Sequence, residues 1–328
     1  MKRIGVIGGG SWATAIVKIL LENCPEVHWY VRNMQTRESL RTEGINPNYL
    51  SDVHFDPQRL KLFEDMNELV SNSEILFMVV PSAFLAEWLK PLTVSLANSF
   101  VVTSIKGIVP EHHRTPSEYL KQHFGVSYSK MGIVSGPCHA EEVALARLSY
   151  LTVCCKETEQ AQYISSLLKS DYIRTIVGQD IYGTEYSAIL KNIYAVAAGV
   201  CHGMGFGDNF QAVLISNAQD EITRFLNLSY PAERNTNTSA YLGDLLVTCY
   251  SQFSRNRTFG TMIGKGYSVR SAQLEMKMVA EGYYATAGVH AINQEHGISM
   301  PIAEAMYKIL YEGKNVQSEM RTLLEKLC

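Results

Sequence analysis

The 328-residue sequence lacks any apolar run near the roughly 20 residues that a membrane-spanning helix needs. Its richest apolar stretch, Ile193 to Cys201, is short and full of small side chains, which indicates a packed helix in a core. The beginning, where Met1-Lys2-Arg3 runs directly into Ile-Gly-Val-Ile-Gly, is too short and too rich in glycine for a signal peptide. We therefore expect a cytoplasmic protein without an integral membrane segment.

Paired cysteines with the spacing of a metal site are also missing. The cysteines are odd in number and none forms a C-x-x-C pair, which favours a reducing compartment over a disulfide framework. The histidines are scattered, without a helix-spaced pair, so no metal is expected. The seven cysteines are Cys24, Cys138, Cys154, Cys155, Cys201, Cys249 and Cys328.

An excess of charge of one sign is absent as well. Lys and Arg number 29 against 32 for Asp and Glu, which gives a formal net charge of -3. This balance provides no bulk attraction to nucleic acid or to anionic lipid, so neither is expected as a partner. Any recognition of an anion must be local.

What the sequence does contain is enough apolar material for a large core, since 46% of its residues are hydrophobic. In the first half, short β-branched runs alternate with helical patterns, as in βαβ units with a mainly parallel sheet. We expect a Rossmann-type α/β domain over residues 1–182. Its strands are expected at residues 2–7, 26–31, 74–80, 99–104, 131–135, 150–155 and 172–177, with a helix at 157–169.

The second half changes character. From Gly183 onward the β-branched runs disappear and long helical patterns take over, at residues 185–204, 211–226 and from Pro301 to the C-terminus. No linker rich in proline or serine separates the halves. An all-α domain over residues 183–328 is therefore expected to follow the sheet domain directly.

A glycine-rich turn follows the first expected strand and opens a helix. It reads Gly8-Gly9-Gly10-Ser11-Trp12-Ala13, a G-x-G-x-x-A pattern. Gly8 permits the tight turn, Gly10 lets the backbone approach a diphosphate, and Ala13 allows close packing of helix on strand. The helix N-terminus supplies N–H groups and a positive dipole. This context predicts a dinucleotide site.

The end of the second expected strand bears on which dinucleotide is bound. An Asp or Glu often stands there to bind the ribose 2′-hydroxyl, whereas this chain has Arg32-Asn33. A cation at that place can accept a 2′-phosphate, stack on adenine or simply face solvent. Both NADP and NAD therefore remain open. Ser82, after the strand that ends near Val80, is a further candidate for lining the cofactor.

Two lysines are candidates for proton chemistry. Lys106 follows an apolar strand, at the edge where ligands collect, and Lys191 lies in the apolar helical pattern Ala188 to Tyr194. Burial disfavours the charged form of an amine and brings its pKa into range for acid–base work. A helical lysine is, however, more often a surface residue with a buried stem. The rest of the sequence is therefore needed to distinguish a catalytic lysine from a surface lysine.

Several sequence blocks accompany these lysines along the chain. They are Gly10-Ser11-Trp12, Ser104-Ile105-Lys106-Gly107, Ser135-Gly136-Pro137-Cys138-His139-Ala140, Gly205-Phe206-Gly207-Asp208-Asn209, Gly243-Asp244-Leu245, Ser254-Arg255-Asn256-Arg257 and Val279-Ala280-Glu281-Gly282-Tyr283. With these blocks in this order, the chain resembles the NAD(P)-dependent glycerol-3-phosphate dehydrogenases of the bacterial type over nearly its whole length.

The resemblance implies a reaction: hydride transfer between NAD(P)H and dihydroxyacetone phosphate, giving sn-glycerol 3-phosphate for glycerophospholipid synthesis, in a homodimer. Lys191 matches the proton donor and acceptor, with Lys106 assisting at the developing charge. Cofactor contacts are implied for Gly8, Gly10, Ser11, Trp12, Arg32, Lys106, Ala140, Arg255, Val279 and Glu281, and substrate contacts for Lys106, Gly136, Cys138, Lys191, Asp244, Ser254, Arg255 and Asn256.

The sequence departs from the family pattern at two of these places. Ala13 replaces a common glycine, which leaves cofactor binding intact. Cys138 stands where Ser or Thr is common, so a weak thiol donor replaces a hydroxyl and the role of this side chain is in doubt.

Two other functions stay open. One is a related β-hydroxyacid dehydrogenase, although its Lys-x-x-x-Asn pair is missing because Asn192 follows Lys191 immediately. The other is a dinucleotide sensor without turnover, against which the two lysines argue.

Overall fold

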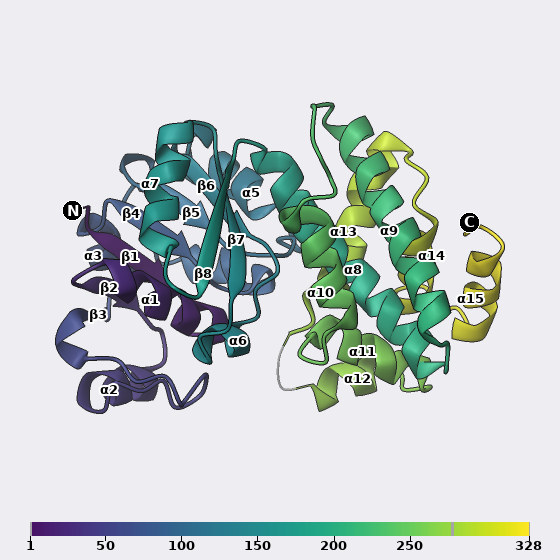
Figure 1. Cartoon of the computed structure of the whole chain (residues 1–328), viewed down its shortest axis with the longest axis horizontal. Helices are drawn as coiled ribbons and strands as arrows, with labels where there is room; N and C mark the ends of the chain where they lie inside the picture. The colour runs from purple at the N-terminus through teal and green to yellow at the C-terminus, as the bar shows by residue number, and fades with distance from the viewer. Residues whose placement is uncertain (1, 277–278, 328) are drawn as a thin grey trace. The chain divides into compact units, whose positions relative to one another are not determined.

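The computed structural model describes residues 2–276 and 279–327 (Figure 1). Cys328, one of the seven cysteines counted above, lies outside the described residues. The chain forms two compact units: unit 1 holds the residues up to Ile105 together with Pro116–Ile181, and unit 2 holds Lys106–Thr115 together with the residues from Tyr182 onward. The division expected after residue 182 differs in one respect, because residues 106–115 group with the helices.

Unit 1 is built on one sheet in the order β3-β2-β1-β4-β5-β6-β7-β8. All neighbouring strands are parallel except β6 and β7, which are antiparallel. The strands are β1 (Ile4–Ile7), β2 (Val27–Tyr30), β3 (Leu60–Phe63), β4 (Ile75–Met78), β5 (Phe100–Thr103), β6 (Met131–Ser135), β7 (Ser149–Cys155) and β8 (Ile173–Gly178).

Helices complete the crossovers between these strands. The central strands β1, β4 and β5 are buried throughout, as expected where helices cover both faces of a parallel sheet. Helix α1 packs against α6 and α7. The helices of unit 1 are α1 (Ser11–Asn23), α2 (Met34–Thr42), α3 (Met66–Ser71), α4 (Leu85–Leu89), α5 (Pro116–Phe124), α6 (Ala140–Ala144) and α7 (Thr158–Leu168).

Unit 2 is mainly helical, and its segment Lys106–Thr115 contains no helix. Its helices are α8 (Ile181–Gly203, whose first residue groups with unit 1), α9 (Asp208–Ser229), α10 (Asp244–Tyr250), α11 (Arg255–Gly264), α12 (Val269–Glu275), α13 (Glu281–His296), α14 (Pro301–Leu310) and α15 (Val316–Leu324). Helix α8 is the centre of this unit, and most of its side chains from Ile189 to Cys201 are fully buried. The expected class, a mainly parallel α/β domain followed by a helical domain, is confirmed.

The structure adds two details that the sequence prediction did not contain. Strand β3 was not expected, because Leu60-Lys61-Leu62-Phe63 is short and has an exposed lysine among its apolar residues. The pattern from Pro301 onward is two helices rather than one. Gly313 adopts a left-handed conformation (φ 65°) and Asn315 caps α15 by accepting from the Ser318 N–H, so the helix stops and restarts.

Glycines set the distance between α8 and α11. A Cβ placed on Gly260 of α11 would lie 2.0 Å from the Val196 carbonyl oxygen, and one on Gly199 of α8 would lie 2.1 Å from the Arg257 carbonyl oxygen. Only backbone fits at such separations. Each helix repeats the small residue four positions later, at Gly203 and Gly264, so the close contact extends over a full turn.

A buried carboxylate joins α8, α9 and α14. Glu221 of α9 accepts hydrogen bonds from the Tyr194 hydroxyl and from the Ile302 and Ala303 N–H groups at the first turn of α14. Its side chain is 1% exposed. Burial raises the pKa of Glu221 to about 7, although the two N–H donors and the phenol oppose that shift.

In the part of the chain that the structure describes, no helix is both long and apolar enough to span a bilayer. The six described cysteines are free thiols, and all but Cys138 are buried.

The Gly260→Ala substitution should lower the free energy of unfolding by about 3 kcal/mol, because the new methyl group can be accommodated only if α8 and α11 separate. Urea denaturation measures this loss. Gly207→Ala is the matched control, since a Cβ there meets nothing within 4 Å. Equal losses in both variants would show that the close contact is not what excludes a side chain at position 260.

The Glu221→Gln substitution should flatten the pH dependence of stability. The native pKa lies above the ordinary value of 4.5, so the group stabilises the fold fully below that pH and loses this contribution as pH rises through about 7. The loss amounts to about 3 kcal/mol in the wild type and should vanish in the variant. Urea denaturation at intervals between pH 4.5 and 7.5 would test it, and parallel curves for the two proteins would contradict it.

Candidate active site

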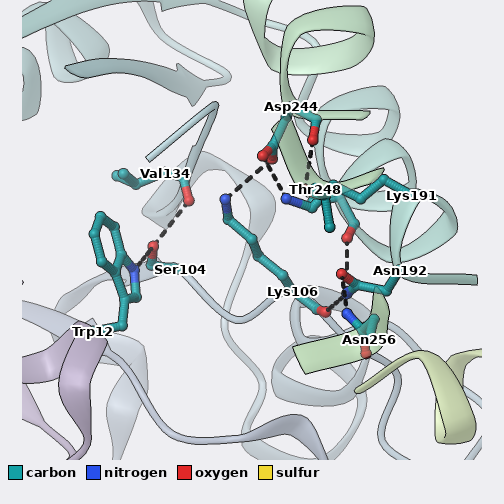
Figure 2. Close-up of polar contacts among 10 residues, drawn as sticks. Trp12, Ser104, Lys106, Val134, Lys191, Asn192, Asp244, Thr248 and Asn256 are labelled. Atoms are coloured by element: carbon teal, nitrogen blue, oxygen red, sulfur yellow. Dashed lines mark hydrogen bonds and ion pairs between the residues drawn. The ribbon is translucent and has the colours of Figure 1, made fainter. Parts of the chain in front are cut away.

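A carboxylate of unit 2, that of Asp244, is almost completely buried and is held between two lysines (Figure 2). The Asp244 Oδ2 atom accepts from Lys106 Nζ at 3.1 Å, and Oδ1 accepts from Lys191 Nζ. The exposed fractions of the three side chains are 1% for Asp244, 6% for Lys191 and 20% for Lys106. Three distant stretches of sequence thus meet at one carboxylate. Two lysines against one aspartate give the cluster one positive charge in excess when both lysines are protonated.

The backbone before Asp244 is irregular and firmly anchored. A π-helical turn, Ser239–Gly243, leads into α10, of which Asp244 is the first residue. Upstream of the turn, the Thr236 carbonyl accepts from Gln219 Nε2 at 2.7 Å, and the Thr236 hydroxyl contacts that of Thr223 at 3.0 Å. Within α10, the Thr248 hydroxyl donates to the Asp244 carbonyl oxygen. Such π turns are rare and are frequent at functional sites.

Burial and the attraction between opposite charges shift the pKa values in this cluster in opposite directions. Desolvation lowers the pKa of Lys191 to about 7, with Lys106 adding to the decrease and Asp244 opposing it. Burial alone would raise the pKa of Asp244, but the two ammonium groups outweigh burial and hold it below its usual value. Lys191 is therefore an amine that can gain or lose a proton near neutral pH, beside a carboxylate that stays ionised.

Asparagines connect this cluster to α11 and α13. Asn192 Nδ2 donates to the Lys106 carbonyl oxygen at 2.6 Å, and its Oδ1 accepts from Asn256 Nδ2 at 2.8 Å. The Asn256 Oδ1 atom in turn accepts from the Gly282 N–H at 2.9 Å. This chain of amides fixes the backbone of Lys106 against α8, and it places the start of α11 beside both (Figure 2).

The start of α11 carries the remaining donors. Ser254 is the N-cap residue and accepts from the Arg257 N–H. Arg255 is the first residue of the helix, and its Nη1 atom donates to the Val279 carbonyl oxygen at 3.3 Å. Glu281 begins α13 just after Val279. A helix N-terminus with an arginine, a serine hydroxyl and an amide suits a phosphate group.

The glycine-rich turn of unit 1 is held by side chains on its carbonyl side. Trp29 Nε1 donates to the Gly8 carbonyl oxygen at 2.7 Å, and Asn46 Nδ2 donates to that of Gly9 at 3.1 Å. Gly8 has a φ of 136°, which favours glycine. Gly10, the N-cap residue of α1, has no side chain with which to cap the helix, and a Cβ on Gly10 would meet nothing within 4 Å. The turn thus fits a diphosphate, because a helix begins directly after a glycine where no side chain stands in the way.

Trp12 and Ser104 form a second fixed contact in this unit. The Trp12 Nε1 atom donates to Ser104 Oγ at 2.7 Å, and Ser104 Oγ donates to the Val134 carbonyl oxygen at 3.0 Å (Figure 2). Ser104 follows β5, two residues before Lys106. The first turn of α1, the end of β5 and β6 are therefore tied together at the carboxyl edge of the sheet.

The segment after β6 and the residue after β2 complete the predicted set in unit 1. Gly136 has a φ of 124°, which favours glycine, and Ala140 is buried at the start of α6. Cys138 is half-buried. Arg32 is largely exposed and pairs with Glu87 of α4 at 3.0 Å. All lie in unit 1, as do Gly8, Gly10, Ser11 and Trp12.

The predicted site residues therefore fall into two groups, one in unit 1 and one in unit 2. The hydrogen bonds and ion pairs described above lie within one unit or the other. The substrate and proton-transfer candidates Lys106, Lys191, Asp244, Ser254, Arg255 and Asn256 lie in unit 2. Sequence reasoning missed Asn192 and Thr248 as parts of the cluster. Asn192 is a buried amide next to a buried lysine in an apolar helix, a signal that could have identified it. Thr248 lies one helical turn after Asp244, but that spacing alone is common.

No group of three or more metal-ligating His, Cys, Asp or Glu side chains occurs among residues 2–276 and 279–327.

Comparisons with known proteins identify the family of the chain. The family model of the NAD-dependent glycerol-3-phosphate dehydrogenase N-terminus matches residues 3–161, and that of the C-terminus matches residues 180–321. The chain is 35% identical to glycerol-3-phosphate dehydrogenase (NAD(P)+) of Staphylococcus epidermidis, over 99% of this chain and 98% of that protein. It is also 35% identical to the Bacillus pumilus enzyme of the same name, over 100% and 95% of the two chains.

A solved structure is similar over the same length. The crystal structure of glycerol-3-phosphate dehydrogenase from Coxiella burnetii has a TM-score of 0.89 and 30% identity, and the match covers 99% of each chain. The resemblance inferred from the motifs is confirmed by these matches: the chain belongs to the NAD-dependent glycerol-3-phosphate dehydrogenase family.

Proposed function

We propose that this protein reduces dihydroxyacetone phosphate to sn-glycerol 3-phosphate, reversibly, with NADH or NADPH, and that Lys191 is the proton donor and acceptor. The observation that carries the proposal is the buried Lys191 amine, with a pKa near 7, hydrogen-bonded to Asp244 in a chain of this family. The product is a building block of glycerophospholipids.

The reduced nicotinamide supplies a hydride to the ketone carbon when bound, so negative charge develops on the ketone oxygen. The Lys191 ammonium donates the proton that this oxygen needs, and in the reverse direction the neutral amine removes it from the C2 hydroxyl. Lys106 stabilises the developing charge through its own ammonium group. Asp244 keeps Lys191 in place and remains ionised throughout, because its pKa is depressed.

The excess positive charge of the cluster suits an anionic substrate. With two ammonium groups and one carboxylate, the cluster has a net charge of +1 when Lys191 is protonated. The substrate phosphate would take up donors at the start of α11, from Ser254, Arg255 and Asn256. The Asn256 amide nitrogen carries two N–H groups, so one donates to Asn192 and the other serves the substrate.

The remaining residue roles are proposed from the family to which the chain belongs. In unit 1, cofactor contacts are proposed for Gly8, Gly10, Ser11, Trp12, Arg32 and Ala140, and substrate contacts for Gly136 and Cys138. In unit 2, cofactor contacts are proposed for Lys106, Arg255, Val279 and Glu281. Unit 1 is then the dinucleotide-binding domain and unit 2 the substrate-binding domain. A homodimer in the cytoplasm completes the proposal.

The experiment that tests the activity follows the absorbance of the reduced nicotinamide with dihydroxyacetone phosphate, in parallel with NADH and NADPH. Consumption that depends on this ketone is the expected result. No consumption from folded protein that binds a dinucleotide would favour a β-hydroxyacid dehydrogenase or a sensor instead.

Activity should depend on pH in opposite ways for the two directions. Reduction needs the Lys191 ammonium, so its kcat/KM should fall tenfold per pH unit above pH about 7, whereas oxidation needs the neutral amine and should rise through the same pH. Profiles between pH 5.5 and 9 with each substrate measure both limbs. If kcat/KM fell above pH 7 for oxidation as well as for reduction, a single group that acts as both acid and base would be contradicted.

The Lys191→Met substitution should lower kcat by about 10²–10⁴-fold and leave dinucleotide affinity unchanged, because the proton donor is lost without loss of a cofactor contact. Lys308→Met is the control: Lys308 lies in the same unit but pairs with Glu304 on α14. Turnover, and cofactor affinity by fluorescence titration, are measured for both. Full turnover in the Lys191 variant would overturn the mechanism.

A further inference from the structure

Arg32 is not an isolated surface cation. Its Nη1 atom lies 3.0 Å from Glu87 Oε1, and its guanidinium carbon lies 4.9 Å from the centre of the Trp88 ring. Trp88 in turn meets the Tyr30 ring edge-on, with the ring centres 6.0 Å apart. These contacts join the end of β2 to α4, and all four residues belong to unit 1.

The backbone around Arg32 is fixed separately. Arg37 Nη1 donates to the carbonyl oxygens of Val31 and Arg32, at 2.7 and 3.0 Å. Asn33 caps α2 by accepting from the Thr36 N–H. The place from which the Arg32 side chain starts is therefore set by the turn, and the direction it takes is set by Glu87 and Trp88.

We propose that Glu87 is a specificity-determining residue that lowers the affinity for NADPH relative to NADH, an inference that rests on the proposed dinucleotide site. In dinucleotide-binding folds, the residue at the end of the second strand reads the ribose 2′ position. Arg32 holds that place here, two residues after β2 ends. In this chain the cation is already engaged by a carboxylate.

The physical argument compares the two cofactors. A 2′-phosphate bound by the Arg32 guanidinium would lie beside the Glu87 carboxylate, because both would be within hydrogen-bond distance of one small planar group. The phosphate would then either displace Glu87 from Arg32 or remain next to a like charge, and either choice weakens binding. The 2′-hydroxyl of NADH has no charge, so it meets no such repulsion.

The test is the Glu87→Gln variant, which keeps the shape and removes the charge. The three tryptophans are Trp12, Trp29 and Trp88, all in unit 1, so their emission reports dinucleotide binding without turnover. At low ionic strength, the Kd for NADPH should fall about tenfold, while that for NADH should change less than about twofold. In 0.5 M salt the gain should shrink, since charges at this exposed site are screened.

The matched control is Glu74→Gln. Glu74 also pairs with an arginine on the surface of unit 1, at 3.7 Å from Arg3 Nε, but it lies at the amino ends of β1 and β4. This variant should leave both Kd values unchanged. A tenfold gain in NADPH affinity here as well would mean that net charge, rather than the pairing of Glu87 with Arg32, is responsible.

A second variant pair tests the route through Arg32. The Arg32→Gln substitution should weaken NADPH binding more in the Glu87→Gln background than in the wild type, because the guanidinium is available to phosphate only after its carboxylate partner is gone. Additive effects, or an unchanged ratio of the two Kd values in Glu87→Gln, overturn the inference. Failure of the wild type to bind either dinucleotide would instead overturn the proposed function.

Discussion

A single buried carboxylate determines where the two lysines of the candidate active site lie. Asp244 is almost completely buried, so it must be compensated, and both of its oxygens are engaged by lysines. One lysine comes from the long central helix and the other from the segment that follows β5. Removing either cation would leave a buried charge with half of its compensation. The site is thus a balance in which the same anion positions both lysines, while burial lowers the pKa of Lys191 to about 7 and the anion opposes that decrease.

The glycine contact between α8 and α11 serves this balance. Helix axes that approach at backbone distance leave no space for side chains between them, so the relative position of the two helices has little freedom. Lys191 and Asn192 lie on one of these helices, and Asn256 lies on the other. The hydrogen bond from the Asn256 side chain to that of Asn192 then spans helices whose separation is already fixed. Rigid placement of donors is what electrostatic stabilisation of a developing charge requires.

Much of this was predictable from the sequence, for identifiable reasons. Buried parallel strands consist of β-branched runs, and the glycine-rich turn has a fixed relation to strand and helix, so the sheet domain and its turn were recognised. The reversed direction of β7 was not, because a side-chain pattern does not encode strand direction. Strand β3 was missed because an edge strand needs few apolar residues. A buried amide beside a buried lysine marks Asn192 itself, but its partner could not be derived, since the amide donates to a carbonyl 86 positions away in the chain.

The assignment of residues 106–115 to unit 2 has a consequence for how the chain can be divided. The chain passes between the units at residues 105–106, 115–116 and 181–182, so neither unit is one continuous piece. Ile108 is fully buried and packs against α13 at Gly288, which anchors this short excursion among the helices. A cut of the polypeptide between Ile181 and Tyr182 would therefore give a C-terminal fragment that lacks one of the two cations of Asp244. The two halves of the sequence are therefore not independent modules. The lysine cluster needs both the segment after β5 and the helices of unit 2.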